Sequence, residues 1–304
     1  MRVRWHDGVM PGPMALTQRS PMQSLAILHL SVLLFGFAGL FGKWIAWDPA
    51  AIVLGRTSVA ALVLALVVRL RDGGMPKFSW AVAPNGVILA LHWVAFFTAI
   101  QVSTVAIGLL GYASFPLFVP LLERVLLGVP MRRREFATAV LVVLGLAMLV
   151  PEFSWASRIV HGLAWGVLSG FTFALLTVRT RQLTPAHRAP EIALWQNLVA
   201  VLCIAPVVLW QGGPGGPVTP QALVLVVLLG TLCTALAHAL FIASLARLTA
   251  STVAVVAALE PVYGIALALM LLHEVPDLRT LLGAALLLVA AVIVSRRTFT
   301  LPPA

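Results

Sequence analysis

Ten apolar runs, each about long enough to cross a membrane as a helix, divide this chain. They fall at approximately 25–44, 50–68, 82–100, 103–122, 135–150, 161–178, 191–210, 222–244, 251–272 and 278–295. A bilayer core about 30 Å thick needs about 20 apolar residues per helix, and somewhat shorter runs are tolerated. Barrel strands alternate polar and apolar residues, whereas these runs are apolar on every face. The sequence therefore predicts an all-α integral membrane protein with ten transmembrane helices.

Composition supports this fold class and argues against other partners. Hydrophobic residues make up 61% of the chain, charged residues 10%, and the mean hydropathy is +1.03. A water-soluble core cannot bury so large an apolar fraction, so the main surroundings are the lipid bilayer. The net charge is +10, but the 20 Lys and Arg residues are spread over short linkers. Because they form no basic stripe, no nucleic-acid partner is expected.

Motifs for catalysis and metal binding are missing from the sequence. The cysteines, Cys203 and Cys233, lie inside apolar runs without CxxC spacing, so neither a metal site nor a disulfide framework is indicated. No linker is long enough for a soluble domain, and no GxxxxGK[ST], HExxH or GxSxG motif occurs. We therefore expect no enzyme activity, no catalytic residue, no cofactor and no ATPase module.

The distribution of Lys and Arg predicts the orientation in the membrane. With both tails inside, sixteen of these residues fall on the inner side. The outer side holds three, namely Lys43, Arg158 and Arg279. Cytoplasmic loops carry the positive excess, so the polar tails at 1–23 and 298–304 are predicted to be cytoplasmic.

Two halves of the chain resemble each other. Residues 103–106 and 251–254 both read Ser-Thr-Val-Ala, and each begins a run with an interior proline. When the third run is laid on the eighth, His92 pairs with His238. The pattern indicates one motif used twice.

The repeat divides the chain into two five-helix units, at 24–150 and 160–297. Because five is odd, the second unit enters the membrane from the opposite side, which makes the repeat inverted. Inverted repeats are typical of secondary transporters, whose substrate lies near the midplane between the halves. A chain that supplies both halves can work alone, as a monomer.

The chain resembles the EamA family of the drug/metabolite transporter superfamily. The most specific matches are Leu-Glu-Pro-Val-Tyr at 259–263, Leu-Leu-His-Glu at 271–274 and Gly-Ala-Ala-Leu at 283–286. The first half is similar through Phe35-Gly36, Arg56 and Phe-Pro-Leu-Phe at 115–118. It departs at Gly128, which is followed by Val129 where the family commonly has glutamate.

Within the family the chain looks most like the YddG-type bacterial exporters of aromatic amino acids. Phe35 and Phe173 stand where tryptophan is common in that family. The resemblance implies export of small metabolites across the bacterial inner membrane, with helices 1, 3, 4, 6, 8 and 9 around a central cavity. The implied cargo is an amino acid, aromatic or neutral, or a related small molecule.

Polar and aromatic residues inside the runs are the candidate substrate contacts. Polar groups are costly in hydrocarbon, so they tend to face the bundle interior or water. The candidates are His92, Tyr112, Trp165, Phe173, His238, Glu260 and Tyr263. His92 has the sharpest rationale, since a neutral imidazole donates to a carboxylate and accepts from an ammonium, which suits a zwitterion. The alternative is a packing histidine.

The other candidates also have structural alternatives. Tyr112 precedes Pro116 and offers a ring that stacks on a planar substrate, and Tyr263 lies one turn beyond Glu260 on the same face. Trp165 forms a stripe with Ser169 and Thr172, beside Phe173. Aromatic residues also collect at membrane interfaces, which is the alternative for Trp165.

Three polar residues of the eighth run, Thr231, Thr234 and His238, are spaced i, i+3 and i+7 and predict one polar helix face. One interpretation is that this face lines the cavity. The alternative is that both threonines bond their own backbone carbonyls and His238 bonds a neighbouring helix.

Two charged residues lie within the runs. Glu260 precedes Pro261, and proline frees a carbonyl and favours a bend, where a carboxyl can bind a proton or a substrate amine. The alternative is a neutral acid bonded to a neighbouring helix or paired with Arg56. For Arg56 a structural ion pair is favoured over substrate contact, and Lys43 is expected to anchor its helix at the interface.

Three functions remain open at this point. The first is a secondary exporter of amino acids or similar metabolites, working by facilitated diffusion or proton exchange. The second is a transporter of a drug-like cation, nucleoside or nucleotide sugar, although nucleotides require several cavity cations and only Arg56 and Lys43 are available. The third is a membrane enzyme or scaffold, which no motif supports.

Overall fold

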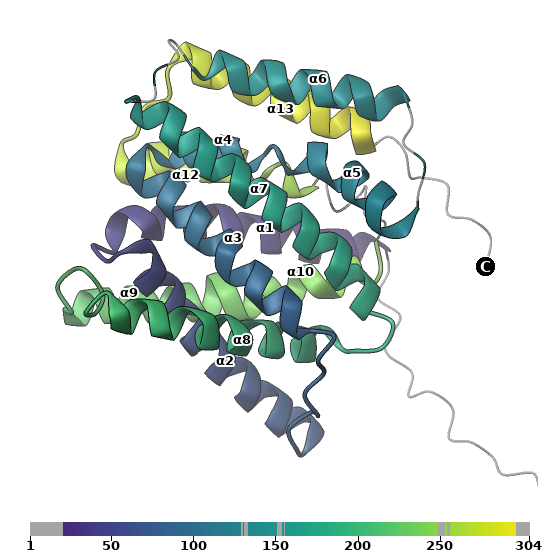
Figure 1. Ribbon diagram of the computed structural model, residues 1–304, viewed down its shortest axis with the longest axis vertical. Helices are drawn as coiled ribbons and strands as arrows, with labels where there is room; N and C mark the ends of the chain where they lie inside the picture. The colour runs from purple at the N-terminus through teal and green to yellow at the C-terminus, as the bar shows by residue number, and fades with distance from the viewer. Residues whose placement is uncertain are drawn as a thin grey trace, which may run out of the picture.

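The computed structural model describes residues 21–128, 130, 133–150, 154, 156–248, 253 and 256–295. Every regular element within these ranges is helical (Figure 1). Five spans are single helices: α1 (Pro21–Trp44), α2 (Pro49–Asp72), α3 (Ala83–Val102), α7 (Arg158–Leu183) and α8 (Ala189–Trp210). Residues 1–20 of the predicted N-terminal tail and the C-terminal tail at 298–304 lie outside the described residues.

Two further spans are composite. One consists of α4 (Val105–Tyr112) and α5 (Phe115–Leu127), and the other of α9 (Pro220–Gly230), the π-helix η1 (Thr231–Leu236) and α10 (Ala237–Leu245). These seven spans are long and apolar enough to cross a membrane.

Three shorter apolar helices complete the described set: α6 (Arg133–Met148), α12 (Glu260–Leu272) and α13 (Leu278–Ser295). Each of the ten predicted runs contains helix, so the prediction of an all-α, multi-pass membrane protein is confirmed for the described residues. The fourth and ninth predicted runs are interrupted by turns, and the eighth contains a π-helix.

The fourth span is broken where a continuous helix was predicted. α4 ends at Tyr112, a turn covers Ala113 and Ser114, and α5 begins with Phe115 followed by Pro116. A similar turn at Ala258 and Leu259 precedes α12, whose second residue is Pro261. Proline has no N–H to continue the hydrogen-bond ladder, which explains both breaks. The bend predicted beside Glu260 is therefore present.

The packing of the helices repeats between the two halves. In the chain's first half, α1 packs on α12 and α10, and in its second half α7 packs on α4, α5 and α3. The second helices, α2 and α8, pack on each other, as do the last helices, α6 and α13, which lie side by side at one edge of the bundle (Figure 1). Thus the first helix of each half covers the broken span of the other half.

Glycines allow these two crossings to be close. A Cβ added at Gly36 of α1 would lie 2.9 Å from the backbone nitrogen of Gly264 in α12. A Cβ added at Gly111 of α4 would lie 2.9 Å from the Cα of Gly166 in α7. Both distances are below van der Waals contact, so each crossing excludes a larger side chain. The crossings hold the two helix breaks beside the neighbouring helices.

The segment between α3 and α4 is fixed by charged side chains from three other places in the chain. Lys43 Nζ donates to the carbonyl oxygen of Ser103 at 2.7 Å, and Arg158 Nε donates to that of Val102 at 2.8 Å. The backbone N–H of Val105 donates to a carboxylate oxygen of Glu274 at 3.0 Å. Lys43 is therefore a cross-link in the bundle as well as the last basic residue of α1.

Replacing Glu274 with alanine is expected to destabilise the start of α4. A carboxylate at a helix N-terminus satisfies a free N–H and interacts favourably with the helix dipole, together worth about 1 kcal/mol. For a chain of this size the unfolding midpoint should fall by about 2 °C. The measurement is thermal unfolding in detergent. The midpoint of Glu274→Gln, which keeps an acceptor oxygen, should fall less than that of Glu274→Ala. Identical midpoints for wild type and Glu274→Ala would show that Glu274 does not cap α4.

Candidate functional site

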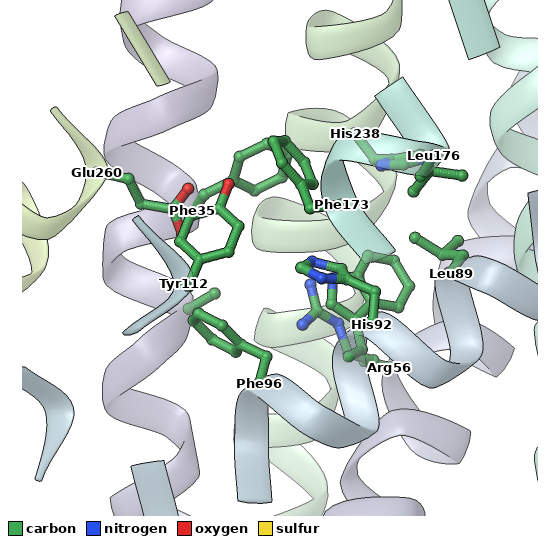
Figure 2. Close-up of a pocket in the computed structure, with 12 residues that line it drawn as sticks. Phe35, Arg56, Leu89, His92, Phe96, Tyr112, Phe173, Leu176, His238 and Glu260 are labelled. Carbon is green, nitrogen blue, oxygen red and sulfur yellow. The ribbon is translucent and has the colours of Figure 1, made fainter. Parts of the chain in front are cut away.

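A cavity lies inside the bundle, between helices of both halves (Figure 2). Its walls come from α1, α2, α3, α4, α7, α10 and α12. It is lined by Phe35, Ala38, Arg56, Leu89, His92, Trp93, Phe96, Tyr112, Phe173, Leu176, His238 and Glu260. Each helix break thus contributes one lining residue, Tyr112 just before the first and Glu260 just after the second.

Aromatic rings form much of the cavity wall. The Tyr112 ring centroid lies 5.1 Å from that of Phe173 and 5.9 Å from that of Phe96, both in edge-to-face arrangements. His92 is 5.3 Å from Phe173 and 5.8 Å from Tyr112. Such rings offer a large apolar surface to a planar or apolar part of a solute.

Arg56 brings a buried positive charge to this aromatic cavity. Its side chain is only 1% exposed, and its Cζ lies 3.9 Å from the centroid of the Trp93 ring, a cation–π contact. Nε donates to Thr234 Oγ1 at 2.9 Å and Nη2 to the carbonyl oxygen of Cys233 at 3.2 Å. Nη1 has no hydrogen bond to a described residue. The guanidinium is therefore held in place with one nitrogen still available.

The ion pair favoured for Arg56 from the sequence is not formed. Among the described residues no carboxylate lies within ion-pair distance of its guanidinium, and the ion pairs that are present involve Arg188. The physical reason is that α2 faces the π-helix of the eighth span, whose free carbonyl and hydroxyl groups accept the guanidinium hydrogens instead. Arg56 thus lines the cavity and also holds α2 to the eighth span.

Glu260 is the carboxyl group that lines the same cavity. It is 3% exposed and is hydrogen-bonded to the hydroxyl of Tyr112 from the other broken span. Figure 2 shows Glu260 beside Tyr112, and Arg56 on a different side of the cavity. In the described part of the chain a guanidinium and a carboxyl group therefore share one buried cavity without forming an ion pair with each other.

Both cavity histidines are held by buried partners. His92 Nδ1 lies 3.0 Å from the carbonyl oxygen of Ser169 and 3.0 Å from its hydroxyl. His238 Nε2 lies 2.8 Å from Oε1 of Gln196 in α8. Each ring is therefore fixed through one nitrogen while its side chain lines the cavity.

Five of the seven candidate residues surround the cavity: His92, Tyr112, Phe173, His238 and Glu260. Trp165 does not, because its side chain is 38% exposed on the outer face of α7. Tyr263 is not among the lining residues either, and its hydroxyl is 3.2 Å from Nδ1 of His29 in α1.

The polar face predicted for the eighth span is divided by the π-helix. Only His238 of the three predicted residues lines the cavity, while Thr231 donates to the carbonyl oxygen of Val227 and Thr234 to that of Leu229, each at 2.7 Å. A π-helix turns less per residue than an α-helix, so the i, i+3, i+7 spacing no longer describes one face. The backbone-bonded alternative for the threonines is confirmed.

Several lining residues were missed by sequence reasoning. Leu89, His92, Trp93 and Phe96 follow the i, i+3, i+4, i+7 pattern of one face of α3, and of these Trp93 was not considered. Trp93 is one of many apolar residues in this run, and nothing in the sequence distinguishes it from those that pack against other helices. The only signal for Arg56 was a charge in an apolar run, and that signal does not distinguish a structural from a cavity position.

Known proteins resemble this chain in sequence and in fold. The pseudopaline exporters CntI of two Pseudomonas aeruginosa strains, UCBPP-PA14 and PAO1, are each 30% identical to it over 255 residues, 82% of this chain and 87% of the relative. A crystal structure whose title states no function matches with a TM-score of 0.68 at 18% identity, covering 92% of this chain and all of that one. At that identity the likeness shows the fold alone.

The model of the EamA-like transporter family matches residues 23–150 and again residues 160–296. The two matches cover most of the chain, and the exporter relatives align with 82% of it. The chain is therefore a transporter and not an enzyme, and it belongs to the EamA-like transporter family.

Proposed function

We propose that this protein is a secondary transporter that exports amino acids or related small zwitterionic metabolites, among which aromatic and neutral amino acids are the leading candidates. The observation that carries the proposal is the position of the Arg56 guanidinium and the Glu260 carboxyl group in one aromatic cavity, where they form no ion pair with each other. A solute with a carboxylate, an ammonium and an apolar side chain complements all three features.

The energetic argument rests on the cost of burying charge. An ionised group removed from water is strongly destabilised unless an opposite charge or several hydrogen bonds compensate it. The free Nη1 of Arg56 is suited to a carboxylate, because charge-assisted bonds to a guanidinium are strong and directional. Glu260 is suited to an ammonium, and the rings between them accommodate the apolar part of the cargo.

The repeated packing of the helices supports an inverted arrangement of the units at 24–150 and 160–297. Each half contributes a first helix that covers the broken span of the other, as a two-fold axis between them requires. Inverted repeats bind substrate between the halves at helix breaks and expose it alternately to the two sides. With both termini in the cytoplasm, as the Lys and Arg distribution predicts, the cycle exports cargo across the bacterial inner membrane. One chain supplies both halves, so the monomer is the proposed working unit.

The relatives support export of a small metabolite. They are named as exporters of pseudopaline, and 82% of this chain aligns with them. The role in their name, export, agrees with the direction of transport proposed for this chain.

Counterflow uptake into proteoliposomes tests the proposal with three solutes of matched shape. L-phenylalanine carries both charges, 3-phenylpropionate only the carboxylate, and phenethylamine only the ammonium. We expect L-phenylalanine to be taken up at least about tenfold better than either analogue, since each charged hydrogen bond is worth about 1.5–3 kcal/mol. A wider amino-acid panel then ranks the side chains. Equal uptake of all three solutes, or no uptake of any, would contradict a zwitterionic cargo.

Glu260 also favours a second candidate, a lipophilic cation. An aromatic cavity with one carboxyl group suits such a cargo, and the same experiment separates the two, because phenethylamine would then exceed L-phenylalanine. Nucleotide sugars fit less well, since Arg56 is the one Lys or Arg among the described lining residues. Lys43 is engaged with Ser103 outside the lining.

A further inference from the structure

A buried chain of polar side chains runs from the cavity toward the ends of α3 and α7. His238 Nε2 is 2.8 Å from Gln196 Oε1, and Gln196 Nε2 donates to Thr180 Oγ1 at 2.9 Å. Asn85 Nδ2 donates to the same oxygen at 3.1 Å, and Arg179 Nε donates to Asn85 Oδ1 at 3.0 Å. Gln196, Asn85 and Thr180 are at most 2% exposed. In hydrocarbon surroundings such a network persists because its members have no water to bond instead.

The orientation of the Gln196 amide bears on which nitrogen of His238 carries the proton. Gln196 directs its amide N–H to Thr180 and therefore presents its oxygen, which can only accept, to the histidine. With the amide in this orientation, His238 Nε2 is the donor. The neutral ring keeps a lone pair on Nδ1, which has no hydrogen bond to a described residue.

The equivalent histidine of the first half has the same property by a different route. His92 Nδ1 faces the backbone carbonyl oxygen of Ser169, which cannot donate, so Nδ1 carries the proton and Nε2 keeps the lone pair. Both cavity histidines therefore offer acceptor nitrogens to a solute. Together with Glu260 they complement a group with several N–H donors, such as an ammonium, better than a carboxylate.

We infer that Gln196 is a positioning residue for cargo recognition, which holds His238 as the Nε2–H tautomer so that Nδ1 accepts a hydrogen bond from the amino group of the cargo. The inference rests on the proposed zwitterionic cargo and adds a specificity determinant to the cavity. Gln196 is not among the lining residues, so it acts through His238. In its absence the imidazole is free to rotate and to exchange tautomers, and a fraction of the molecules then presents N–H to the ammonium.

Two substitutions separate positioning from simple packing. Gln196→Met has similar volume but no polar atom for His238, whereas Gln196→Glu keeps an acceptor oxygen toward Nε2. We expect Gln196→Met to raise the half-saturation concentration for L-phenylalanine about tenfold, the loss of one hydrogen bond, with little change for 3-phenylpropionate. Gln196→Glu should return it to within about twofold of wild type. A merely structural role would weaken uptake of both solutes alike.

Gln101→Met provides the matched control. Gln101 is another glutamine of a membrane helix, partly buried, and its Nε2 donates to the carbonyl oxygen of Trp47 at 2.8 Å, with neither residue among the cavity lining. This variant loses a comparable hydrogen bond but should keep the wild-type preference for L-phenylalanine over 3-phenylpropionate. If it changes the preference as much as Gln196→Met does, the positioning role is refuted.

A measurement without cargo tests the tautomer directly. In ¹⁵N NMR spectra of histidine-labelled protein in lipid nanodiscs, protonated and bare ring nitrogens resonate apart, and His238→Gln identifies the His238 signals among the seven histidines. Wild type should show Nε2–H, and Gln196→Met a mixture of tautomers. An unchanged spectrum in Gln196→Met overturns the inference. If the spectra change as expected but wild type carries none of the solutes, the tautomer assignment is supported and the zwitterionic cargo fails.

Discussion

Replacing Arg56 with glutamine is expected to reduce uptake of L-phenylalanine and 3-phenylpropionate about 10- to 100-fold, with a smaller effect on phenethylamine. The reason is that the guanidinium is the positive charge available to a carboxylate in the described cavity lining. Loss of a charged hydrogen bond costs about 1.5–3 kcal/mol, which corresponds to a reduction in affinity of about 10- to 100-fold. The measurement is the half-saturation concentration for each solute in proteoliposomes.

Arg56 also contacts the protein, so its variant needs controls. Its bonds to Thr234 and Cys233 hold α2 against the π-helix, and their loss will lower stability as well. Retained uptake of phenethylamine and an unchanged size-exclusion profile show that the variant is folded. Arg56→Lys keeps the charge without the planar fork and should fall between wild type and glutamine. If uptake of all three solutes falls equally, Arg56 has a structural role and does not bind the carboxylate of the cargo.

Replacing Glu260 with glutamine should produce the opposite selectivity. Uptake of L-phenylalanine and phenethylamine is expected to fall about 10- to 100-fold, and uptake of 3-phenylpropionate to be maintained. Glutamine has the same shape and still accepts from the Tyr112 hydroxyl, so the substitution removes mainly the charge. The same three uptake curves measure the effect.

Tyr112→Phe gives the graded comparison for Glu260. It removes the hydroxyl that bonds the carboxyl group but keeps the ring packed on Phe173, so a loss several times smaller is expected.

Coupling of transport to protons through Glu260 is tested on the same samples by imposing a pH gradient across the proteoliposome membrane. If Glu260→Gln responds to the gradient as wild type does, Glu260 does not carry a coupling proton. Full uptake of L-phenylalanine by Glu260→Gln would show that Glu260 is not the contact for the ammonium group.

Local sequence signals predicted the helical elements well, and the packing decided which residues reach the cavity. Apolar length located the helices because lipid requires every span to bond its own backbone. The proline after Glu260 predicted a bend, and a turn is present there. The same reasoning could not distinguish Trp165 from Phe173, since both are aromatic residues of α7 and only the packing leaves Trp165 exposed and Phe173 buried. Gly166, which follows Trp165, packs on Gly111, whereas Phe173 meets Tyr112.

Long-range contacts were beyond any local pattern. Gln196 stands beside Asn197 in an apolar run, and its bonds to His238 and Thr180 join residues 42 and 16 positions away. The π-helix changed the phase of the eighth span in a way that no spacing rule anticipates, and it redirected Arg56 to Cys233 and Thr234. These contacts determine the polarity of the cavity.

The sequence by itself determined that this chain is a helical membrane protein with a repeated motif, because hydrophobic length and repetition are properties of the linear chain. It also supplied a short set of polar and aromatic candidates, because buried polarity is rare in lipid. Only the tertiary structure decided that Arg56 and Glu260 share a cavity without pairing, and that Gln196 orients His238. Such relations depend on how distant helices cross, and the crossings are set by packing between side chains that no single segment contains.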